Sequence, residues 1–448
     1  MSKTVKIRKG ANIKLVGSAE KTTSDTTLPS SFALKPTDFH GMVPKLLLKE
    51  GAEVKAGTPI FYSKSNERIK FVSPVSGEIA EVVRGAKRKI LEVKIVADSE
   101  QKSETAAPVD FSSFDRAKMA DALLDAGLWP FIKRRPYDII ADPTEAPKSI
   151  FVSGFDSAPL GADLNYILEG READFQTGID ALSKLTEGEV HLNIQSGSGS
   201  FMANAKNAQV NTFTGPHPAG LPGIQIHHID PVNKGEVVWV VDAQAVAIIG
   251  RFLKTGKFDF SKKIALAGSE VEKPQYLNTW IGASLDSILK GRVRDGDNRI
   301  IDGNVLSGNK LSEDGYLGFH SNVISVIPEG REPQFMGWLA PNFHKFSLSQ
   351  SYFSWLMPNK KYRLNTNMNG EDRAFVMSGQ YEDVLPMDLY PVHLLKAIMT
   401  NDIEKMEALG IYEVAPEDLA LCEYACTSKT PVQKLIREGL DTAIQELG

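Results

Sequence analysis

The chain has 448 residues, enough for roughly three or four domains of ordinary size, each with its own hydrophobic core. Its 51 basic and 56 acidic residues leave a net charge of −5, which gives no indication of a nucleic-acid partner. The two cysteines exclude a disulfide framework, and neither a signal peptide nor a membrane-spanning run is expected, which favours the cytoplasm.

A small all-β domain is predicted first, over residues 1–105. Between residues 43 and 95, short apolar pieces alternate with breaks that contain Gly or Pro. The order of these pieces resembles the biotinyl/lipoyl barrel-sandwich domain. A carrier domain of that type needs an acceptor lysine at its hairpin tip, but the sequence has Asn66 there, and the nearby Lys64 lacks the usual flanks. We therefore expect a docking barrel without a prosthetic group, with a lipoyl or biotin carrier as the alternative.

A Rossmann-like α/β domain is predicted over residues 106–258, because strand-length apolar runs alternate with helical periodicity. The expected elements are a helix ending at Gly127, strands at 149–153 and 189–194, a helix at 174–184, and a buried strand entering a helix at 237–250.

Two other features of this domain are candidate ligand sites. The Gly-Ser-Gly-Ser run at 197–200 lacks the third glycine of a nucleotide loop, since Met202 occupies its place, and it predicts a flexible loop instead. Three of the eight histidines lie within residues 214–228. On a strand, His227 and His228 would point to opposite faces and could not share a metal ion. In place of a metal site we therefore expect a loop made rigid by Gly and Pro.

Three further regions complete the chain. Residues 259–330 predict a β-grasp (SLBB) module of short strands around one short helix, and residues 331–385 an aromatic-rich β/loop region. Within that region, residues 351–357 are expected to be exposed for docking. Residues 386–448 predict a helical domain with helices at 392–409 and 431–447. Aromatic side chains are frequent between positions 334 and 384: Phe335, Trp338, Phe343, Phe346, Tyr352, Phe353, Trp355, Tyr362, Phe375 and Tyr381.

Both cysteines lie between the two predicted C-terminal helices, in a stretch typical of an iron–sulfur ligand loop that has lost its ligands. If Pro431 closes a C-x2-C-x2-C-x3-C-P loop, the four ligand positions fall on Ala420, Glu423, Cys426 and Thr430. Cys422 is one residue out of register. Since a four-iron cluster needs four thiolates, we expect Cys422 and Cys426 to be ordinary buried thiols of a degenerate cluster loop, with no metal bound.

The order of these regions resembles the C subunits of Rnf-type ferredoxin:NAD oxidoreductases, and parts of it resemble the flavin subunit of complex I. The whole chain is similar to the A-subunit family of sodium-translocating NADH:quinone oxidoreductases. The distinctive segments are Val-Ser-Pro-Val-Ser-Gly at 72–77, Arg-Gly-Ala-Lys-Arg at 84–88, Gly-Leu-Trp at 127–129, Gly-Pro-His-Pro-Ala-Gly-Leu at 215–221, Asn-Val-Leu-Ser-Gly at 304–308 and Ala-Leu-Cys at 420–422.

Flavin-binding relatives wrap the flavin phosphate in a glycine-rich loop after the first helix. Here Leu128 and Trp129 occupy that position, so flavin and NADH binding are not expected. The residues that replace the loop mix aromatic and basic side chains, which suits a quinone or an anionic partner surface. We expect the following residues to lie near quinone or a partner, the alternative being an exposed basic loop whose tryptophan fills the vacated site: Trp129, Phe131, Lys133, Arg134, Arg135 and Tyr137.

The resemblance implies a peripheral subunit on the cytoplasmic face of the cell membrane, within a hetero-hexameric complex that couples NADH oxidation and ubiquinone reduction to Na+ export. It implies that flavins and iron–sulfur clusters lie in partner subunits, that this chain binds no cofactor, and that it carries no catalytic residue. An Rnf-type electron-transfer subunit that retains flavin or a cluster is the alternative, and a free-standing scaffold is another.

Overall fold

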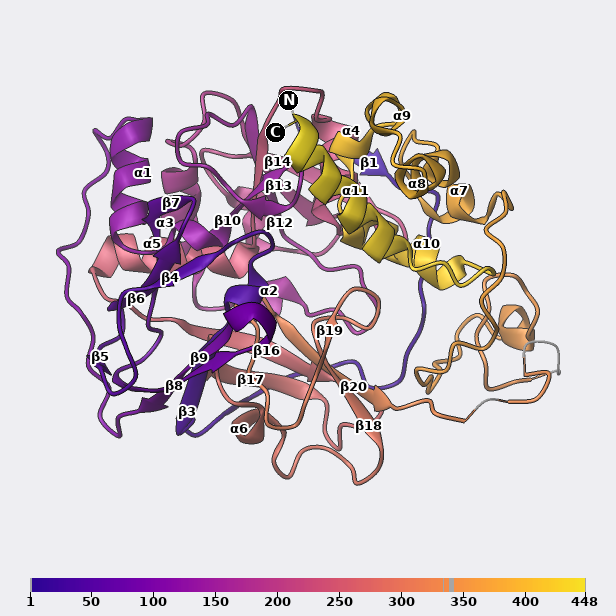
Figure 1. Ribbon diagram of the computed structural model, residues 1–448, viewed down its shortest axis with the longest axis horizontal. Coiled ribbons are helices and arrows are strands. Elements are labelled where there is room, and N and C mark those ends of the chain that lie inside the picture. The colour runs from indigo at the N-terminus through magenta and orange to yellow at the C-terminus, as the bar shows by residue number, and fades with distance from the viewer. Residues whose placement is uncertain (1, 333, 338–341, 448) are drawn as a thin grey trace.

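A computed structural model describes residues 2–332, 334–337 and 342–447 (Figure 1). The chain folds into a barrel-sandwich of two small sheets, a mixed α/β sheet, a β-grasp sheet and a C-terminal set of helices, which confirms the predicted multidomain α/β and β architecture. In the described part of the chain, no helix combines the length and the apolar character needed to cross a membrane.

The α/β sheet has seven strands in the order β1-β14-β13-β12-β15-β10-β11. The strands from β1 to β15 pair in parallel, and β10 and β11 add an antiparallel edge. The predicted strands and helices of this domain are confirmed to within a few residues. The strands are β1 (Thr4–Lys6), β10 (Ile132–Arg135), β11 (Ile139–Ile140), β12 (Ser149–Ser153), β13 (Val190–Gln195), β14 (Gln209–Thr214) and β15 (Val238–Val241).

The helices of this domain are amphipathic, and their apolar faces are buried. Helices α3 and α5 approach each other closely, because a Cβ added at Gly250 of α5 would lie 1.8 Å from the backbone oxygen of Asp174 in α3. Only glycine permits that distance. The helices are α1 (Arg116–Asp125), α2 (Leu164–Ile167), α3 (Glu172–Leu182), α4 (Pro222–Ile229) and α5 (Ala243–Thr255), with short 3-10 turns η3 (Trp129–Phe131) and η4 (Phe201–Asn204).

The barrel-sandwich consists of a four-stranded sheet, β3-β9-β8-β5, and a three-stranded sheet, β4-β6-β7, which confirms the predicted all-β unit. Its strands are β3 (Ser31–Leu34), β4 (Pro44–Leu46), β5 (Glu53–Val54), β6 (Pro59–Ser63), β7 (Asn66–Val72), β8 (Gly77–Arg84) and β9 (Ile90–Ala97), with turns η1 (Pro36–Asp38) and η2 (Ala86–Arg88). The first two strands of the predicted range pair with strands outside the barrel. Strand β1 pairs with β14 of the α/β sheet, and β2 (Glu20–Asp25) pairs with β17 of the β-grasp sheet.

The β-grasp sheet has six strands in the order β19-β18-β20-β16-β17-β2. One short helix, α6 (Leu285–Leu289), connects β17 to β18, as the sequence predicts. The strands are β16 (Ser261–Ala267), β17 (Gln275–Trp280), β18 (Asn298–Asp302), β19 (Asn309–Leu311) and β20 (Val323–Pro328).

The aromatic-rich region contains only two short helical elements in its described residues, η5 (Phe353–Leu356) and α7 (Gln380–Val384). The β part of its prediction is therefore wrong for those residues, where the one bridge formed is between Tyr362 and Leu15. The prediction of an exposed segment at 351–357 is half right, since Trp355 and Leu356 are exposed but Tyr352 is buried. The predicted aromatic position Trp338 lies outside the described residues.

The C-terminal helices pack on one another across the top right of Figure 1. The single helix predicted at 392–409 is wrong, because the chain bends at Asn401, which has a φ of 52°. Asp402 then caps a new helix by accepting a hydrogen bond from the Lys405 N–H. The elements are α8 (Pro391–Met399), α9 (Ile403–Ala408), η6 (Ile411–Glu413), η7 (Pro416–Leu419), α10 (Ala420–Ala425) and α11 (Val432–Leu447).

Candidate functional site

The segment at 127–137, which contains the six predicted site residues, begins at the C-terminal end of α1. Gly127 turns the chain in the left-handed region, with a φ of 65°, and a Cβ there would lie 2.4 Å from the Val72 side chain of the barrel. Leu128 and Trp129 follow and are both fully buried. The Trp129 Nε1–H donates to the Ala141 carbonyl at 2.7 Å, and its ring meets Trp239 edge-on at 5.3 Å. The two side chains therefore form part of the hydrophobic core.

The chain then returns through the α/β sheet as β10, antiparallel to β15. Phe131 is buried against Phe319 of the β-grasp module, with ring centroids 4.6 Å apart. Beyond the strand, Tyr137 and Asp138 have positive φ values of 83° and 51°, which turn the chain toward the C-terminal helices. This segment thus contacts three regions of the protein.

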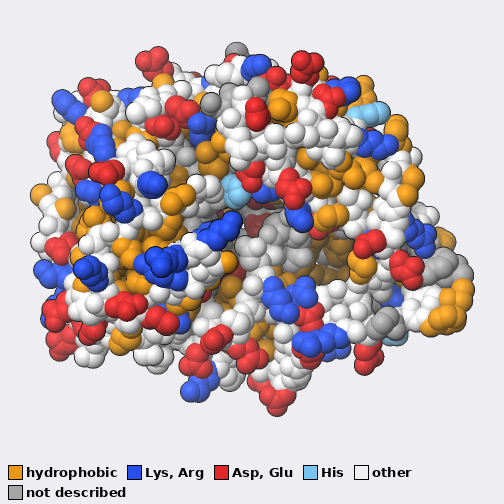
Figure 2. Space-filling view, in the orientation of Figure 1, with side chains coloured by type: hydrophobic (Ala, Val, Ile, Leu, Met, Phe, Trp, Pro, Cys, Tyr) orange, Lys and Arg blue, Asp and Glu red, His pale blue; other side chains and the backbone are white. Residues whose placement is uncertain are grey.

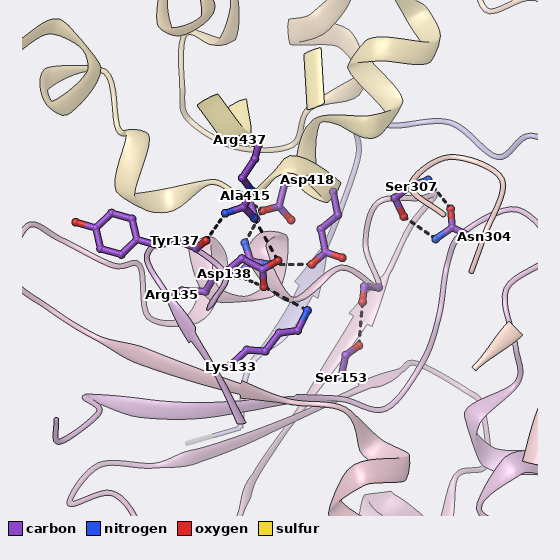
Figure 3. A network of polar contacts seen from close by, with 12 residues as sticks. Lys133, Arg135, Tyr137, Asp138, Ser153, Asn304, Ser307, Ala415, Asp418 and Arg437 are labelled. Carbon is purple, nitrogen blue, oxygen red and sulfur yellow. Dashed lines mark hydrogen bonds and ion pairs between the residues drawn. The ribbon is translucent and has the colours of Figure 1, made fainter. Parts of the chain in front are cut away.

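Arg135 lies at the centre of a buried ionic network that joins β10 to the C-terminal helices (Figure 3). Its side chain is 4% exposed, and its guanidinium donates to Asp418 at 3.0 Å and to Glu417 at 2.7 Å, both in η7. Asp138 lies 3.7 Å from the Arg135 Nε. Since charged groups inside a protein persist only when they are paired, these contacts hold η7 against the sheet.

Two further cations meet Asp138. The ammonium of Lys133 lies 3.6 Å from Asp138, and the guanidinium of Arg437 on α11 lies 3.7 Å from it. Arg437 also donates to the Tyr137 carbonyl at 2.7 Å. The network therefore connects β10 and the turn after it to both η7 and α11.

The network shifts the pKa values of its carboxylates in opposite directions. Burial raises the pKa of Asp138, but Lys133, Arg135 and Arg437 outweigh it and hold that pKa far below its ordinary value. For Glu417, burial outweighs the attraction of Arg135 and raises the pKa to about 7. Burial also raises the pKa of Asp418. These shifts favour the ionised form of Asp138 and act against ionisation of the two η7 carboxylates.

The structure places the six predicted site residues together, but it buries most of them. Trp129, Phe131, Arg135 and Tyr137 are buried. Arg134 is only 16% exposed, pairs with Glu145 at 2.6 Å and stacks over the Tyr137 ring at 5.3 Å. The interpretation as an exposed basic loop is wrong, because the segment forms a sheet strand whose cations are paired. Lys133, at 34% exposed, is the most accessible of the three cations.

The cysteine stretch begins as a helix, because Cys422 lies within α10 and Cys426 is at the C-terminal end of that helix, and both thiols are buried. The Cys422 thiol faces the Tyr381 carbonyl at 3.9 Å, and burial raises its pKa. Burial also acts to raise the pKa of Cys426, but the neighbouring Tyr381 hydroxyl and the Thr430 N–H, which donates to the thiol sulfur at 3.4 Å, lower it. Of the other ligand positions, Glu423 accepts from the Gln433 N–H at 2.8 Å and so caps α11.

A cavity of about 920 Å³ opens beside this loop, between the C-terminal helices and the aromatic-rich region. Figure 2 shows a hollow near the middle of this face, below α11 in the orientation of Figure 1. Cys426, Lys429 and Gln433 line one side of the cavity, and Phe346 and Tyr352 line the other. No sequence pattern predicts this cavity, because its walls come from segments far apart in the chain.

The conditional placement of His227 and His228 on a strand is wrong, because both lie on α4, which begins at Pro222. The His227 ring pairs with Glu413 at 2.8 Å, and the His228 ring contacts the Pro386 carbonyl at 2.9 Å. His217 is buried beside Ser157 at 3.1 Å, and burial lowers its pKa to about 4. Among the described residues, no group of three or more His, Cys, Asp or Glu side chains is arranged to hold a metal ion.

Sequence reasoning missed the acidic half of the network. Glu417 and Asp418 follow Pro416, a pattern that indicates only the first turn of a helix. Arg135 and Asp418 are 283 residues apart in the sequence, so no local pattern could predict that they pair.

Comparisons with known proteins cover nearly the whole chain. Residues 5–98 match a family described as the NqrA N-terminal barrel-sandwich hybrid domain, and residues 114–258 match the NqrA second alpha/beta domain. Residues 263–313 match the NQRA C-terminal domain, an SLBB family.

Curated relatives match at full length. The chain is 36% identical over 445 residues to the A subunit of the Na(+)-translocating NADH-quinone reductase of Photorhabdus laumondii, covering 99% of this chain and 100% of the relative. It is 38% identical over 446 residues to the protein of that name from Neisseria meningitidis serogroup B, covering 99% and 100%. The protein of that name from Rhodopirellula baltica is 37% identical over 447 residues, with 98% of each chain covered.

Proposed function

Because the chain belongs to the A-subunit family of the Na(+)-translocating NADH-quinone reductases, we propose that it is a peripheral subunit of such a complex, on the cytoplasmic face of the membrane. The complex would couple NADH oxidation and quinone reduction to Na+ export. The full-length match carries this proposal. Ubiquinone as the quinone and a hexameric assembly are further parts of the same proposal, taken from the sequence resemblance.

Within this complex, the subunit binds no flavin of its own. A flavin phosphate needs backbone N–H groups that it can approach closely, which glycines permit. At the corresponding position Leu128 and Trp129 fill the space with fully buried side chains, and the Trp129 Nε1–H is already bonded to the Ala141 carbonyl. The residues present therefore do not fit a flavin. The α/β sheet itself has five parallel strands with flanking helices, which supports descent from a Rossmann-like, nucleotide-binding sheet.

The helices α8 to α11 are, in this proposal, the remnant of an iron–sulfur domain. Two cysteines cannot supply four thiolate ligands, and Cys426 is the one thiol in register with the ligand pattern. Glu423, at another ligand position, instead caps α11. The flavins and clusters of the complex would then lie in its other subunits.

The proposal of quinone proximity narrows to two residues of β10. Trp129, Phe131, Arg135 and Tyr137 are buried, so a quinone could reach the segment only at the partly exposed Lys133 and Arg134. These two side chains would orient or border a quinone rather than react with it, because both are paired with carboxylates, Asp138 and Glu145.

Affinity purification of a tagged chain from its host's membranes tests the family-level proposal. We expect hydrophobic, flavin-bearing subunits to co-purify with it, and a chain recovered alone from gently solubilised membranes would contradict the proposal. The isolated chain should be colourless, since flavin at one equivalent per chain would show that Leu128 and Trp129 do not block the site. In the assembled complex, a photoreactive quinone should label residues 127–137, and labelling confined to other subunits would refute the quinone part alone.

A further inference from the structure

The aromatic-rich region contains a long stretch without a single carboxylate. Acidic residues make up 56 of the 448, one in eight, so the 37 residues at 334–370 would ordinarily include four or five. They include none, whereas four cations occur there: Lys345, Lys360, Lys361 and Arg363. Two of the five tryptophans of the chain also lie in this stretch. In a protein with a net charge of −5, this composition sets the stretch apart.

Apolar side chains of the same stretch are exposed, and we refer to Phe335, Met336, Phe343, Trp355 and Leu356 as the apolar patch. Phe335 is 95% exposed, and the exposed fractions of the other four lie between 45% and 55%. Figure 2 shows hydrophobic side chains gathered at the right-hand edge of the molecule, where this region stands out from the rest in Figure 1. Large apolar side chains at this exposure mark an interaction surface.

The apolar patch is held together by internal contacts. The Phe343 ring packs against Phe353 at 4.7 Å between centroids, and Phe353 begins η5, which carries Trp355 and Leu356. The Lys360 ammonium donates to the Phe343 carbonyl at 2.7 Å, which fixes the two parts of the stretch side by side. Next to Met336, the Gly337 carbonyl accepts hydrogen bonds from Lys345 at 2.9 Å and Tyr352 at 2.5 Å, which tie the start of the stretch to the rest of the folded surface.

The cations are divided between anchoring the stretch and bordering the patch. Arg363 anchors it, because its guanidinium makes two hydrogen bonds, at 2.8 and 3.0 Å, to Glu270 of the β-grasp module. Lys345 and Lys360 donate to backbone carbonyls and lie 5.4 Å from the rings of Tyr352 and Tyr362. Lys361 is exposed. The charge of these three lysines is thus not offset by any carboxylate of the stretch itself.

We propose that the apolar patch and its lysines form a membrane-contact surface that inserts aromatic side chains among the headgroups of a bilayer containing anionic lipid. Tryptophan and phenylalanine prefer the bilayer interface, and lysine stems can lie along apolar surface while their ammonium groups reach the phosphates. The cytoplasmic leaflet carries a negative surface potential that attracts such a patch.

The positive charge around the apolar patch favours lipid rather than a membrane protein as its partner. Cytoplasmic loops of membrane proteins carry an excess of Lys and Arg, which would repel a surface bordered by three lysines. This choice rests in part on the proposed function, since a subunit on the cytoplasmic face is within reach of the inner leaflet. The lipid affinity itself belongs to the isolated chain and can be measured without any partner.

Vesicle co-sedimentation of the purified full-length chain tests the proposal. We expect the chain to pellet with vesicles containing about 30% phosphatidylglycerol, and to bind pure phosphatidylcholine vesicles at least tenfold more weakly. Lys361→Gln should weaken binding about fivefold. Trp355→Ala should weaken it about tenfold and, in the parent chain, Trp emission should shift to the blue on vesicle addition.

Matched variants outside the patch control for surface changes in general. Lys102→Gln removes an exposed lysine of the barrel region, and Tyr390→Ala removes an exposed aromatic ring at the start of α8. Both should bind vesicles like the parent. Equal binding to neutral and anionic vesicles, or equal loss in the control variants, would overturn the proposal. Failure to bind any vesicle while Trp355→Ala abolishes capture of the membrane subunits would overturn it in favour of a protein partner, and would leave the proposed function intact.

Discussion

Removal of the Arg135 guanidinium should loosen the C-terminal helices from the α/β sheet. In Arg135→Ala, Asp418 loses its ion-pair partner while its side chain is fully buried, and the Ala415 N–H, at 2.8 Å, is its remaining hydrogen-bond donor. Asp138 is less affected, because Lys133 and Arg437 still face it at 3.6 and 3.7 Å. A buried pair broken on one side costs about 3–5 kcal/mol, so we expect about 4 kcal/mol.

Hydrogen exchange followed by mass spectrometry is the suitable assay, because a protein of several domains does not unfold in one step. A loss of about 4 kcal/mol should speed amide exchange in α10 and α11 by roughly three orders of magnitude, while the barrel strands exchange as before. The exposed pair of Arg331 and Asp297, also 2.7 Å at its shortest, supplies a matched control. Arg331→Ala should change stability by less than about 1 kcal/mol.

A second variant separates lost charge pairing from lost packing. Arg135→Met with Asp418→Asn removes both charges and keeps similar side-chain volumes, and it should recover more than half of the protection lost in Arg135→Ala. If Arg135→Ala alters exchange in α10 and α11 no more than Arg331→Ala does, the network does not hold these helices. If the double variant is as loose as the single one, packing rather than the unpaired carboxylate explains the loss.

Three other changes have expected outcomes. Trp129→Ala should speed amide exchange in β10 and β15 by roughly two to four orders of magnitude, which corresponds to a local loss of about 3–5 kcal/mol, and a loss below about 1 kcal/mol would mean that the ring is not part of the core. Burial raises the pKa of Glu417 to about 7, so its stability contribution is complete below about pH 4.5 and is lost as the pH rises through 7. The stability of Glu417→Gln relative to the parent should therefore rise by about 1 kcal/mol between about pH 5 and pH 8, a value reduced because the Glu417 side chain is 35% exposed. A stability difference that does not change with pH would disprove the pKa shift. Gly250→Ala should lower the thermal midpoint by several degrees, because its Cβ would meet the Asp174 carbonyl; an unchanged midpoint would show that α3 can move aside.

Local elements of this fold could be predicted because local chemistry determines them. The strand at 149–153 and the helix that ends near Gly127 follow from apolar periodicity and from a residue that permits a positive φ. The position of the first two strands could not be predicted, because β1 and β2 pair with β14 and β17, strands that lie more than two hundred residues further along the chain. Alternating apolar and polar residues identify a strand but not its partner.

The error at 222–229 has a different cause. Ile224, Gln225 and Ile226 favour a strand by composition, yet Pro222 occupies the first turn of a helix, where its fixed φ and missing N–H are tolerated. The signal for a helix was therefore present in the sequence. In the β10 segment no such signal existed, because the burial of Arg135 depends on carboxylates in η7.

The basic run at 133–135 binds the kind of group that its composition predicts, but that group belongs to the same chain and not to a partner. Its composition predicts an anionic surface nearby, and each cation does meet one: Lys133 pairs with Asp138, Arg134 with Glu145, and Arg135 with Glu417 and Asp418. All of these carboxylates belong to the chain itself. Because η7 directly precedes α10, these ion pairs join the basic run to the stretch that contains both cysteines.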